Sequence, residues 1–532
     1  MKKNTYFKKR YSIFSIVGLL SLHVSAQFVP PIPQIQPVGT PLWNINATIR
    51  PRGEIRHGLG NPVDSRAEAS AFISQRTNLN VGFRFDKLNA NIDFRDVRVW
   101  GQDASSINNN DGSKFFIHQA WVEWLLASNS DTNCPLRIDN LSLKLGRQEI
   151  IYDDSRLFGN LDWLQQGRRH DAAILKIMHN GYQIDLGGAF NQNTDAFGYV
   201  GIMYTGVNGY GSSGNVTTNS AGVPVYVGTT PPSTNALSNQ YRSFKYIYAT
   251  RKFNQTKYSF LFFNDDFQRF NFSSNNNLRT YIPGKIKNRF TVGGQISTQF
   301  GNASDGIRFA FTGGGYVQYG ENPRLAENAS NLSMNKLNAQ HYFGYLTATK
   351  GNWSTGPGYE LLTGNETRHT QALNGTVSQT IVGNENKQFD PLYGTPHRWW
   401  GYMDYFYVGT GAPSAGLANY YWRIRYAKPK WSVTADLHHF ASAYQNIYYQ
   451  KFGDTDFKKL SQSYGQEVDL ILNYQANRFT NLEFGYCFFL NTPTLAVAKN
   501  INPDATGPFQ QWTYIMLTFR PDFLYQKPVP LE

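Results

Sequence analysis

Arginine side chains recur at two-residue spacing in several segments of the chain. Arg50, Arg52 and Arg56 alternate with apolar residues such as Ile49 and Ile55. In an extended strand, residues i and i+2 point to the same side, so these guanidinium groups share a face opposite the apolar side chains. A guanidinium binds a carboxylate or a phosphate through two parallel hydrogen bonds. The chemistry that this pattern supports is therefore anion binding.

The same alternation places further cations on the polar face of later segments. The candidate binding cations from this pattern are Arg50, Arg52, Arg56, Arg76, Arg84, Arg95, Lys144, Arg423 and Arg425. The acidic residues on the same face are Glu54, Asp93, Glu123, Glu467, Asp469 and Glu483. For Arg242, Arg289 and Arg308 the pattern does not fix the face. Two interpretations stay open: a salt-bridged wall that stiffens the fold, or a cation-lined path that favours a carboxylated or phosphorylated solute.

Residues that could carry catalysis or bind a metal do not combine into a recognisable site. His438 and His439 are adjacent, so in a strand they point to opposite faces and cannot share a metal ion. His170 and Asp171 could orient an imidazole, but no serine can be placed beside them. We therefore expect neither an enzyme nor a bound metal or cofactor.

The composition indicates which fold positions these residues. The chain has 532 residues, of which 15% are aromatic and only 16% charged, whereas a soluble domain carries about 25% charged residues. Its mean hydropathy is −0.46, and beyond the N-terminus no run of about 18 apolar residues forms a spanning helix. The two cysteines, Cys134 and Cys487, exclude a disulfide framework and a thiolate metal cluster. A transmembrane β-barrel fits these features better than a soluble β-sandwich.

The N-terminus indicates export from the cytoplasm. Lysines and Arg10 precede an apolar stretch, and Val24-Ser25-Ala26 has the small residues of a cleavage site. We predict a cleaved signal peptide over 1–26, followed by a Pro-rich periplasmic tail over 27–43. The remaining chain carries 45 Lys and Arg against 37 Asp and Glu. This modest surplus does not favour a nucleic-acid partner.

The two-residue period recurs in eighteen segments, an even number as in bacterial outer-membrane barrels. They are 44–56, 71–85, 88–100, 115–126, 140–149, 168–179, 182–192, 242–253, 257–267, 287–299, 306–320, 341–349, 356–365, 419–427, 430–441, 464–475, 480–490 and 510–520. Gly401–Val408 also resembles a strand, but the even number places it inside the long 366–418 connection.

Short and long connections alternate between these segments. Asp86-Lys87 and Asn180-Gly181 are short, whereas 193–241 and 366–418 are long. We predict an all-β, antiparallel transmembrane outer-membrane β-barrel of about 18 strands, with short periplasmic turns and long extracellular loops. The predicted barrel covers 44–520, and a C-terminal tail covers 521–532.

One cation does not fit the period. Arg147 shares the outward parity of Leu143 and Leu145. Either the strand has left the hydrocarbon region at this point, or Gly146 forms a bulge that turns Arg147 inward. We favour the bulge, because the segment leads into a loop rich in Asp, Arg and Trp.

In these motifs the chain resembles the alginate-export family of outer-membrane barrels, in the version of Bacteroidota-type homologues. The strongest motif is LKLGRQEIIYDDSRLFGNLDWLQQGRRHDAAIL over Leu143–Leu175, supported by AFISQRT, DVRVWG and FDPLYGTPHRWWGYMDYF. The resemblance implies an 18-stranded barrel with an arginine-lined conduit through which a polyuronate diffuses out of the cell. It adds Arg147, Arg156, Arg168 and Arg169 as candidate pathway residues.

The combined expectation is a passive channel for an anionic saccharide in the outer membrane of a Gram-negative bacterium. The loops over 366–418 or 193–241 could fold inward as a constriction. Expected partners are the saccharide, outer-membrane lipid with lipopolysaccharide, and periplasmic secretion proteins that continue the path. The alternatives are a general or anion-selective porin and a surface-adhesion barrel that acts through its long loops.

Overall fold

The computed structural model of the protein describes residues 38–101, 114–129, 138–191, 215–218, 224–227, 241–273, 278–301, 306–406 and 413–525. The predicted signal peptide, most of the Pro-rich segment and Cys134 lie outside these residues. Across the described ranges, no helix has both the length and the apolar character needed to cross a membrane.

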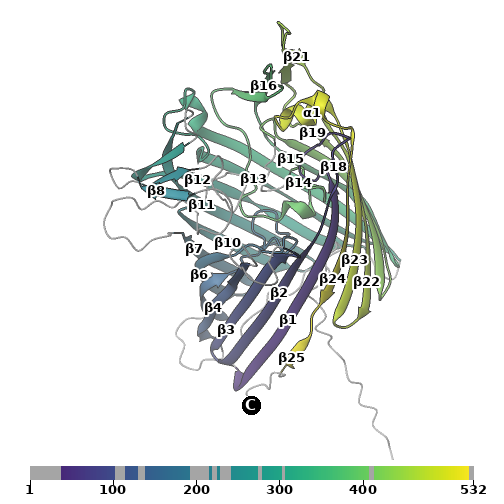
Figure 1. The fold of residues 1–532 in the computed structure, drawn as a ribbon. Helices are drawn as coiled ribbons and strands as arrows, with labels where there is room; N and C mark the ends of the chain where they lie inside the picture. The colour runs from purple at the N-terminus through teal and green to yellow at the C-terminus, as the bar shows by residue number, and fades with distance from the viewer. Residues whose placement is uncertain are drawn as a thin grey trace, which may run out of the picture.

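In the described part of the chain, eighteen antiparallel strands form one closed barrel (Figure 1). They are β1 (Val38–His57), β2 (Ser70–Asp86), β3 (Leu88–Val99), β4 (Lys114–Ser128), β5 (Asn140–Gln148), β6 (His170–His179), β7 (Tyr182–Phe190), β10 (Ser243–Phe253), β11 (Thr256–Ser273), β12 (Leu278–Phe300), β13 (Arg308–Glu321), β14 (Lys336–Lys350), β15 (Trp353–Leu362), β18 (Leu417–Ala427), β19 (Trp431–Ala441), β22 (Ser463–Asn477), β23 (Thr480–Asn491) and β24 (Phe509–Phe519). Each strand pairs with the next, and β24 pairs with β1 to close the ring. Each of the eighteen predicted segments coincides with one of these strands, so the predicted fold class is confirmed.

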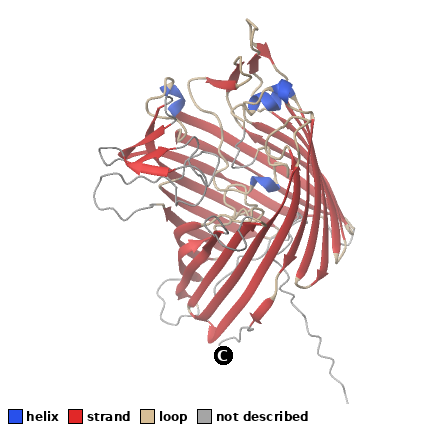
Figure 2. Ribbon diagram, in the orientation of Figure 1, coloured by secondary structure: helices blue, strands red, loops and turns tan. Residues whose placement is uncertain are grey.

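The two ends of the barrel differ in their connections. At one end, tight turns join neighbouring strands, with positive φ angles at Asp86, Asn180 and Asn254. At the other end, long loops carry a separate four-stranded sheet and short helices (Figure 2). These elements are β16 (Glu366–Gln371), β17 (Val377–Val382), β20 (Ile447–Gln450), β21 (Lys458–Lys459), α1 (Pro493–Ala498), η2 (Leu332–Asn335), η3 (Pro396–Arg398) and η4 (Pro503–Ala505). Short β8 (Asn215–Thr218) and β9 (Pro224–Val227) extend β12, and β25 (Asp522–Tyr525) pairs with the start of β1.

Side chains alternate between a lipid-facing side and the lumen along the barrel strands. On β1, Ile49 and Ile55 are 40% and 55% exposed on the outside, whereas Arg50 and Arg52 are 3% exposed inside. The inward orientation predicted from the two-residue period is thus observed on this strand. An apolar outer band and a polar interior are what a barrel wall needs in a lipid bilayer.

Four inward-facing glycines lie under a tyrosine ring from the neighbouring strand. These cross-strand pairs are Gly187–Tyr246, Gly293–Tyr316, Gly358–Tyr421 and Gly485–Tyr514. A Cβ atom added at any of the four glycines would lie 2.0 to 2.6 Å from a tyrosine ring atom. Glycine therefore provides the space in which a large ring lies flat on the inner wall.

Two extracellular loops fold into the barrel and fill its middle. They are the β5–β6 loop, residues 149–169, and the β15–β18 loop, residues 363–416, which meet through a bridge between Phe158 and Tyr393. Trp399, Tyr405 and Tyr393 are among the largest fully buried side chains, so the core lies inside the barrel. The inward folding predicted for 366–418 is found in residues 386–406, where Gly401–Phe406 is not a strand and 407–408 lie outside the described residues. The inward β5–β6 loop was not predicted.

Candidate functional site

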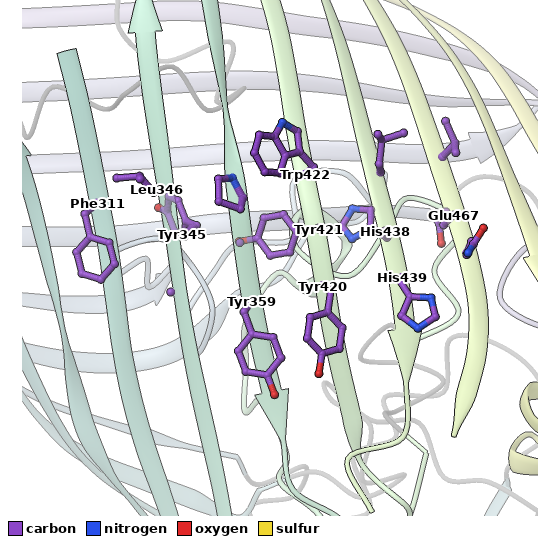
Figure 3. Close-up of a pocket in the computed structure, with 16 residues that line it drawn as sticks. Phe311, Tyr345, Leu346, Tyr359, Tyr420, Tyr421, Trp422, His438, His439 and Glu467 are labelled. Atoms are coloured by element: carbon purple, nitrogen blue, oxygen red, sulfur yellow. The ribbon is translucent and has the colours of Figure 1, made fainter. Parts of the chain in front are cut away.

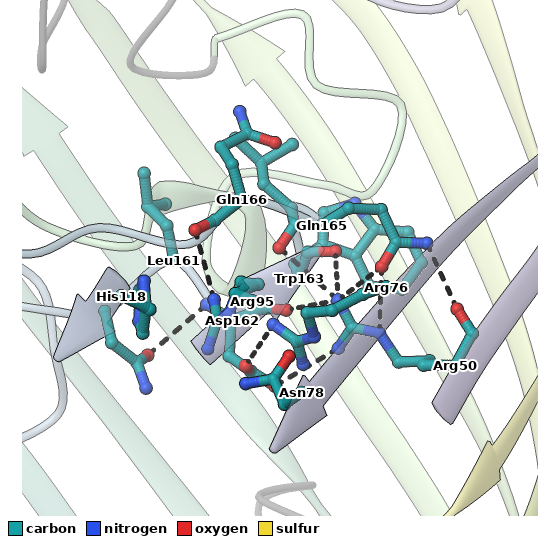
Figure 4. A network of polar contacts seen from close by, with 12 residues as sticks. Arg50, Arg76, Asn78, Arg95, His118, Leu161, Asp162, Trp163, Gln165 and Gln166 are labelled. Carbon is teal, nitrogen blue, oxygen red and sulfur yellow. Dashed lines mark hydrogen bonds and ion pairs between the residues drawn. The ribbon is translucent and has the colours of Figure 1, made fainter. Parts of the chain in front are cut away.

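Three arginines from adjacent strands form a cluster on the inner wall (Figure 4). Arg50 on β1 and Arg76 on β2 are direct cross-strand partners, and Arg95 follows on β3. Each of the three residues is only 3% exposed, because the β5–β6 loop covers them from the lumen side. Cations on neighbouring strands repel one another, so the arginine cluster requires anionic or carbonyl partners.

Asp162 of the β5–β6 loop supplies a carboxylate to the arginine cluster. Its Oδ1 lies 2.8 Å from Arg76 Nη1, and its Oδ2 lies 3.2 Å from Arg50 Nη1. Loss of hydration inside the barrel raises the pKa of the Asp162 carboxyl, but Arg76 and Arg50 outweigh it and hold the pKa well below its ordinary range. The loop therefore keeps an ionised carboxylate on the guanidinium groups.

Other groups of the same loop accept hydrogen bonds from further donors of the arginine cluster. Arg50 Nε donates to Gln165 Oε1 at 3.2 Å, and Arg95 Nη1 donates to the main-chain oxygen of Gln166 at 3.0 Å. On the wall itself, Arg95 Nη2 lies 3.2 Å from Asp93 Oδ2. The predicted acid Asp93 therefore neutralises a neighbouring arginine of β3.

Further along β1, a second group of charges is balanced within the wall. Glu54 lies 2.8 Å from Arg52 Nε through Oε1 and 2.7 Å from Arg56 Nη2 through Oε2. The Trp512 indole also donates to Glu54, at 3.1 Å. The Arg52 guanidinium stacks 4.2 Å from the ring centre of Trp163. For these residues the structure matches the interpretation of a salt-bridged wall.

A stack of rings joins the two in-folded loops near the arginine cluster. His397 lies between Trp163 and Tyr402, with ring centres 4.4 Å and 4.7 Å away. Asp404 Oδ1 is 2.6 Å from His397 Nδ1 and orients the imidazole. The stack therefore links the two loops inside the barrel.

Arg156, a candidate from the family resemblance, anchors the β5–β6 loop to the opposite wall. Its guanidinium contacts Glu360 of β15 and lies 2.8 Å from Asp154. His341 Nε2 is 2.6 Å from the same Glu360 carboxylate. Burial lowers the pKa of Arg156, but Glu360 and Asp154 outweigh it and raise the pKa above its ordinary value. Arg156 is also covered by the Trp399 ring at 4.0 Å, so it holds the loop rather than lining an open path.

Three more candidates fix the in-folded loops. Arg168 Nη1 donates to a main-chain carbonyl of the β15–β18 loop at 2.5 Å. Glu467 Oε1 accepts from the main-chain N–H of Met403 at 2.7 Å, and Asp469 Oδ2 accepts from that of Tyr402 at 3.2 Å. These two acids of β22 therefore hold the β15–β18 loop against the wall.

The remaining inward cations are Arg84, Lys144, Arg423 and Arg425. Arg423 Nη2 lies 2.7 Å from Asp436 on β19. The Lys144 ammonium lies 3.8 Å from the ring centre of Trp121. These four residues sit on the inner face of the barrel strands, and their part in binding a solute stays a prediction.

Arg147 corrects the sequence-based assignment. Arg147 lies on the outer face, where its guanidinium forms a two-bond pair with Asp171 at 2.8 and 2.9 Å. Gly146 does adopt a φ of 116°, but the register of β5 with β6 continues through it, so Arg147 is not turned inward. An exposed ion pair on the outer face is what the other interpretation expects, in which the strand has left the hydrocarbon region at this point. Arg169, the last residue of the β5–β6 loop, stacks 4.3 Å from the ring centre of Phe116, and its part in binding a solute stays a prediction.

The loop carboxylates are the functional residues that the sequence did not reveal. Asp162 is one, and Asp390 of the β15–β18 loop is another, with Oδ1 3.0 Å from Arg289 Nη1. Asp265 on β11 completes this second pair, 2.5 Å from Arg289 Nη2. The available signal was Leu161 and Trp163 beside Asp162, since apolar side chains in a loop indicate burial.

A groove lies on the other side of the wall. It has a volume of about 900 Å³ and is lined by Tyr359, Tyr420, Trp422 and His439 (Figure 3). These side chains point toward lipid, so the groove is not part of the lumen. Within the described ranges, no group of three or more His, Cys, Asp or Glu side chains is placed to hold a metal ion.

The closed barrel, its apolar outer band and its charged, loop-narrowed lumen define an outer-membrane β-barrel. The fold is similar to solved outer-membrane channels. These include OpdK of Pseudomonas aeruginosa (9% identity, TM-score 0.51, 90% of this chain and 99% of that chain) and OccK9 (OpdG) of the same species (11%, 0.51, 90% and 98%). OccAB2 of Acinetobacter baumannii is similar as well (12%, 0.51, 91% and 98%).

Residues 42–189, which run from β1 through β7, match the family described as alginate export. A search of curated proteins finds no match. The matched segment contains the arginine cluster and the whole β5–β6 loop.

Proposed function

We propose that the protein is a passive outer-membrane channel for an anionic, carboxylated polysaccharide or oligosaccharide. One observation carries the proposal: Arg50 and Arg76 hold the Asp162 carboxylate inside the lumen. Because Asp162 belongs to a loop and not to the wall, a carboxylate of the solute can take its place. The guanidinium groups then replace the hydration that the solute carboxylate loses.

Arginines that are already paired with a loop carboxylate can still bind a solute, because one carboxylate can be exchanged for another. The Asp162 side chain is 45% exposed, whereas those of Arg50 and Arg76 are 4% exposed, so the loop carboxylate is the reachable partner. In a solute with repeated carboxylates, the next carboxylate can reach the arginines before the previous one dissociates. No energy source is needed, because each exchange conserves the number of ion pairs.

The matched family and the charges of the lumen support an acidic saccharide as the solute. A general or anion-selective porin would use the same arginines and is the alternative. The proposal also includes interactions with outer-membrane lipid and lipopolysaccharide, periplasmic secretion partners and the Bacteroidota-type origin. A surface-adhesion role would instead depend on the extracellular sheet of β16, β17, β20 and β21.

Ion selectivity of the purified protein in a planar bilayer tests the proposal. We expect anion preference under a salt gradient, block by polyuronate oligomers, and loss of both in R50A/R76A. R66A is the matched control, because Arg66 pairs with Asp64 in an exposed loop. Cation preference, or conductance that polyuronate does not change, would overturn the proposal.

A further inference from the structure

A group of carboxamides lines the inner wall between the arginine cluster and the periplasmic end of the barrel. This amide patch consists of Asn44, Asn46, Asn80, Asn89 and Asn91 on strands β1, β2 and β3. Asn46 is the cross-strand partner of Asn80, and Gly82 separates Asn44 from Asn91 in the next row. The patch is therefore continuous across three strands.

The amide patch is open to the lumen, unlike the arginine cluster above it. Its five members are half-buried, whereas Arg50, Arg76 and Arg95 are 3% exposed beneath the β5–β6 loop. Among the described residues, Asn46 Nδ2 donates to Asn44 Oδ1 at 3.2 Å. The side chains of Asn80, Asn89 and Asn91 have no hydrogen-bond partner in the described ranges. Their amide groups therefore face the solvent of the periplasmic vestibule.

The chemistry of the amide patch fits hydroxyl groups. A carboxamide offers two N–H donors and a carbonyl acceptor, while neighbouring hydroxyls of a sugar both donate and accept. Adjacent partners lie about 5 Å apart across strands, and rows lie about 7 Å apart along them. Gly82 leaves the floor of the patch without a side chain: a Cβ there would lie 3.6 Å from Asn91 Oδ1 and 3.7 Å from Asn44 Cβ.

The upper edge of the patch carries a balanced pair of charges. Asp93 is the cross-strand partner of Asn80, and its two oxygens accept from Asn78 Nδ2 at 2.9 and 3.0 Å. Asp93 also pairs with Arg95 at 3.2 Å, so the two charges at this edge balance each other within the wall and leave the amide of Asn80 to meet a neutral hydroxyl. Carboxylates are therefore expected at the arginine cluster and hydroxyls at the amide patch.

The geometry points to a saccharide-binding site at the amide patch, which recognises the uncharged hydroxyl edge of a pyranose on the periplasmic side of the constriction. This inference deepens the proposed function and rests on it. A solute that touches both places must be a hydroxyl-rich chain that also carries carboxylates. A small organic anion would engage the arginine cluster alone.

The test separates hydroxyl recognition from carboxylate recognition. The full mature protein in a planar bilayer is exposed from the periplasmic side to neutral β-1,4-linked mannohexaose and, separately, to a polyuronate hexamer. We expect mannohexaose to block the wild-type channel and to block N46A/N80A/N91A about tenfold more weakly, because several neutral hydrogen bonds are lost. The reversal potential of this variant should match wild type, because no charge changes.

Two further variants control for folding and position. Q511A removes an amide from the lipid-facing side of β24 and should leave mannohexaose block unchanged, and N80Q should retain most of the block. Absence of mannohexaose block in wild type, or equal block in wild type and the triple variant, would overturn the amide site. Cation preference or lack of polyuronate block would instead contradict the proposed function, whatever mannohexaose does.

Discussion

Arg76 Nη1 lies 2.8 Å from Asp162 Oδ1, which joins strand β2 to a loop that enters the barrel from its extracellular end. The pair gives the lumen two properties at once. It neutralises an arginine that would otherwise repel Arg50 beside it, and it holds the β5–β6 loop across the path. A solute carboxylate that replaces Asp162 would therefore bind and release the loop in one step.

Replacement of Asp162 by asparagine should expose the arginine cluster to solutes. In D162N the loop amide carries no charge, so Arg50 and Arg76 lose their anionic partner while the size of the side chain is kept. We expect stronger anion preference and roughly tenfold tighter polyuronate block, equivalent to about 1.4 kcal/mol. Reversal potentials and block constants in planar bilayers measure both.

D64N is the matched control for this change, because Asp64 pairs with Arg66 in an exposed extracellular loop. It removes one carboxylate without touching the lumen. Weaker anion preference in D162N, or the same change in D64N, would show that Asp162 does not compete with the solute.

The Asp162 pair also predicts how conductance depends on pH. Since the folded-state pKa of Asp162 is depressed by Arg76 and Arg50, the free energy of the loop attachment is fully present above the ordinary pKa of about 3.9. It declines as pH falls from there and is lost only when pH reaches the depressed folded-state pKa. We therefore expect wild-type conductance to be constant between about pH 4 and pH 8 and to rise only well below pH 4. A rise that D162N shows equally would assign the change to another group.

The barrel could be predicted from the sequence because its wall obeys a local rule. Every second residue of a strand must be apolar against lipid, so the period that places Ile49 outside and Arg50 inside is readable without tertiary information. β11 and β12 run past their predicted segments to Ser273 and Leu278.

The filling of the lumen could not be predicted in the same way. The partners of Arg50 and Arg289 are Asp162 and Asp390, which lie more than 100 residues away in loops without a period. Arg147 shows a different failure. It keeps the outward parity of its strand, but its partner Asp171 could not be read from that parity. Strand parity gives the face of a residue but not what covers it.

Arg156 is predicted to matter for stability rather than for transport. Replacement by methionine leaves the buried Glu360 carboxylate without its guanidinium, and loss of one partner of a buried pair costs about 3–5 kcal/mol. We expect R156M to unfold at markedly lower urea concentration in a gel assay that separates folded from unfolded barrel. The double variant R156M/E360Q should recover much of the loss, and an R156M barrel as stable as wild type would contradict this role.

The glycine–tyrosine pairs predict a strong contrast between two alanine substitutions on neighbouring strands. At Gly358 a Cβ atom would lie 2.1 Å from the Tyr421 ring, whereas at the outward-facing Gly344 the nearest atom would be 3.8 Å away. Because the Tyr421 ring must move into a packed interior, G358A should destabilise the barrel by about 1–3 kcal/mol. G344A is the matched control and should unfold like wild type in the same urea assay.

If the Tyr421 ring is the obstacle, the double variant G358A/Y421A should lose less stability than the sum of the losses in the two single variants. Full additivity of the two changes would instead locate the requirement for glycine in the backbone.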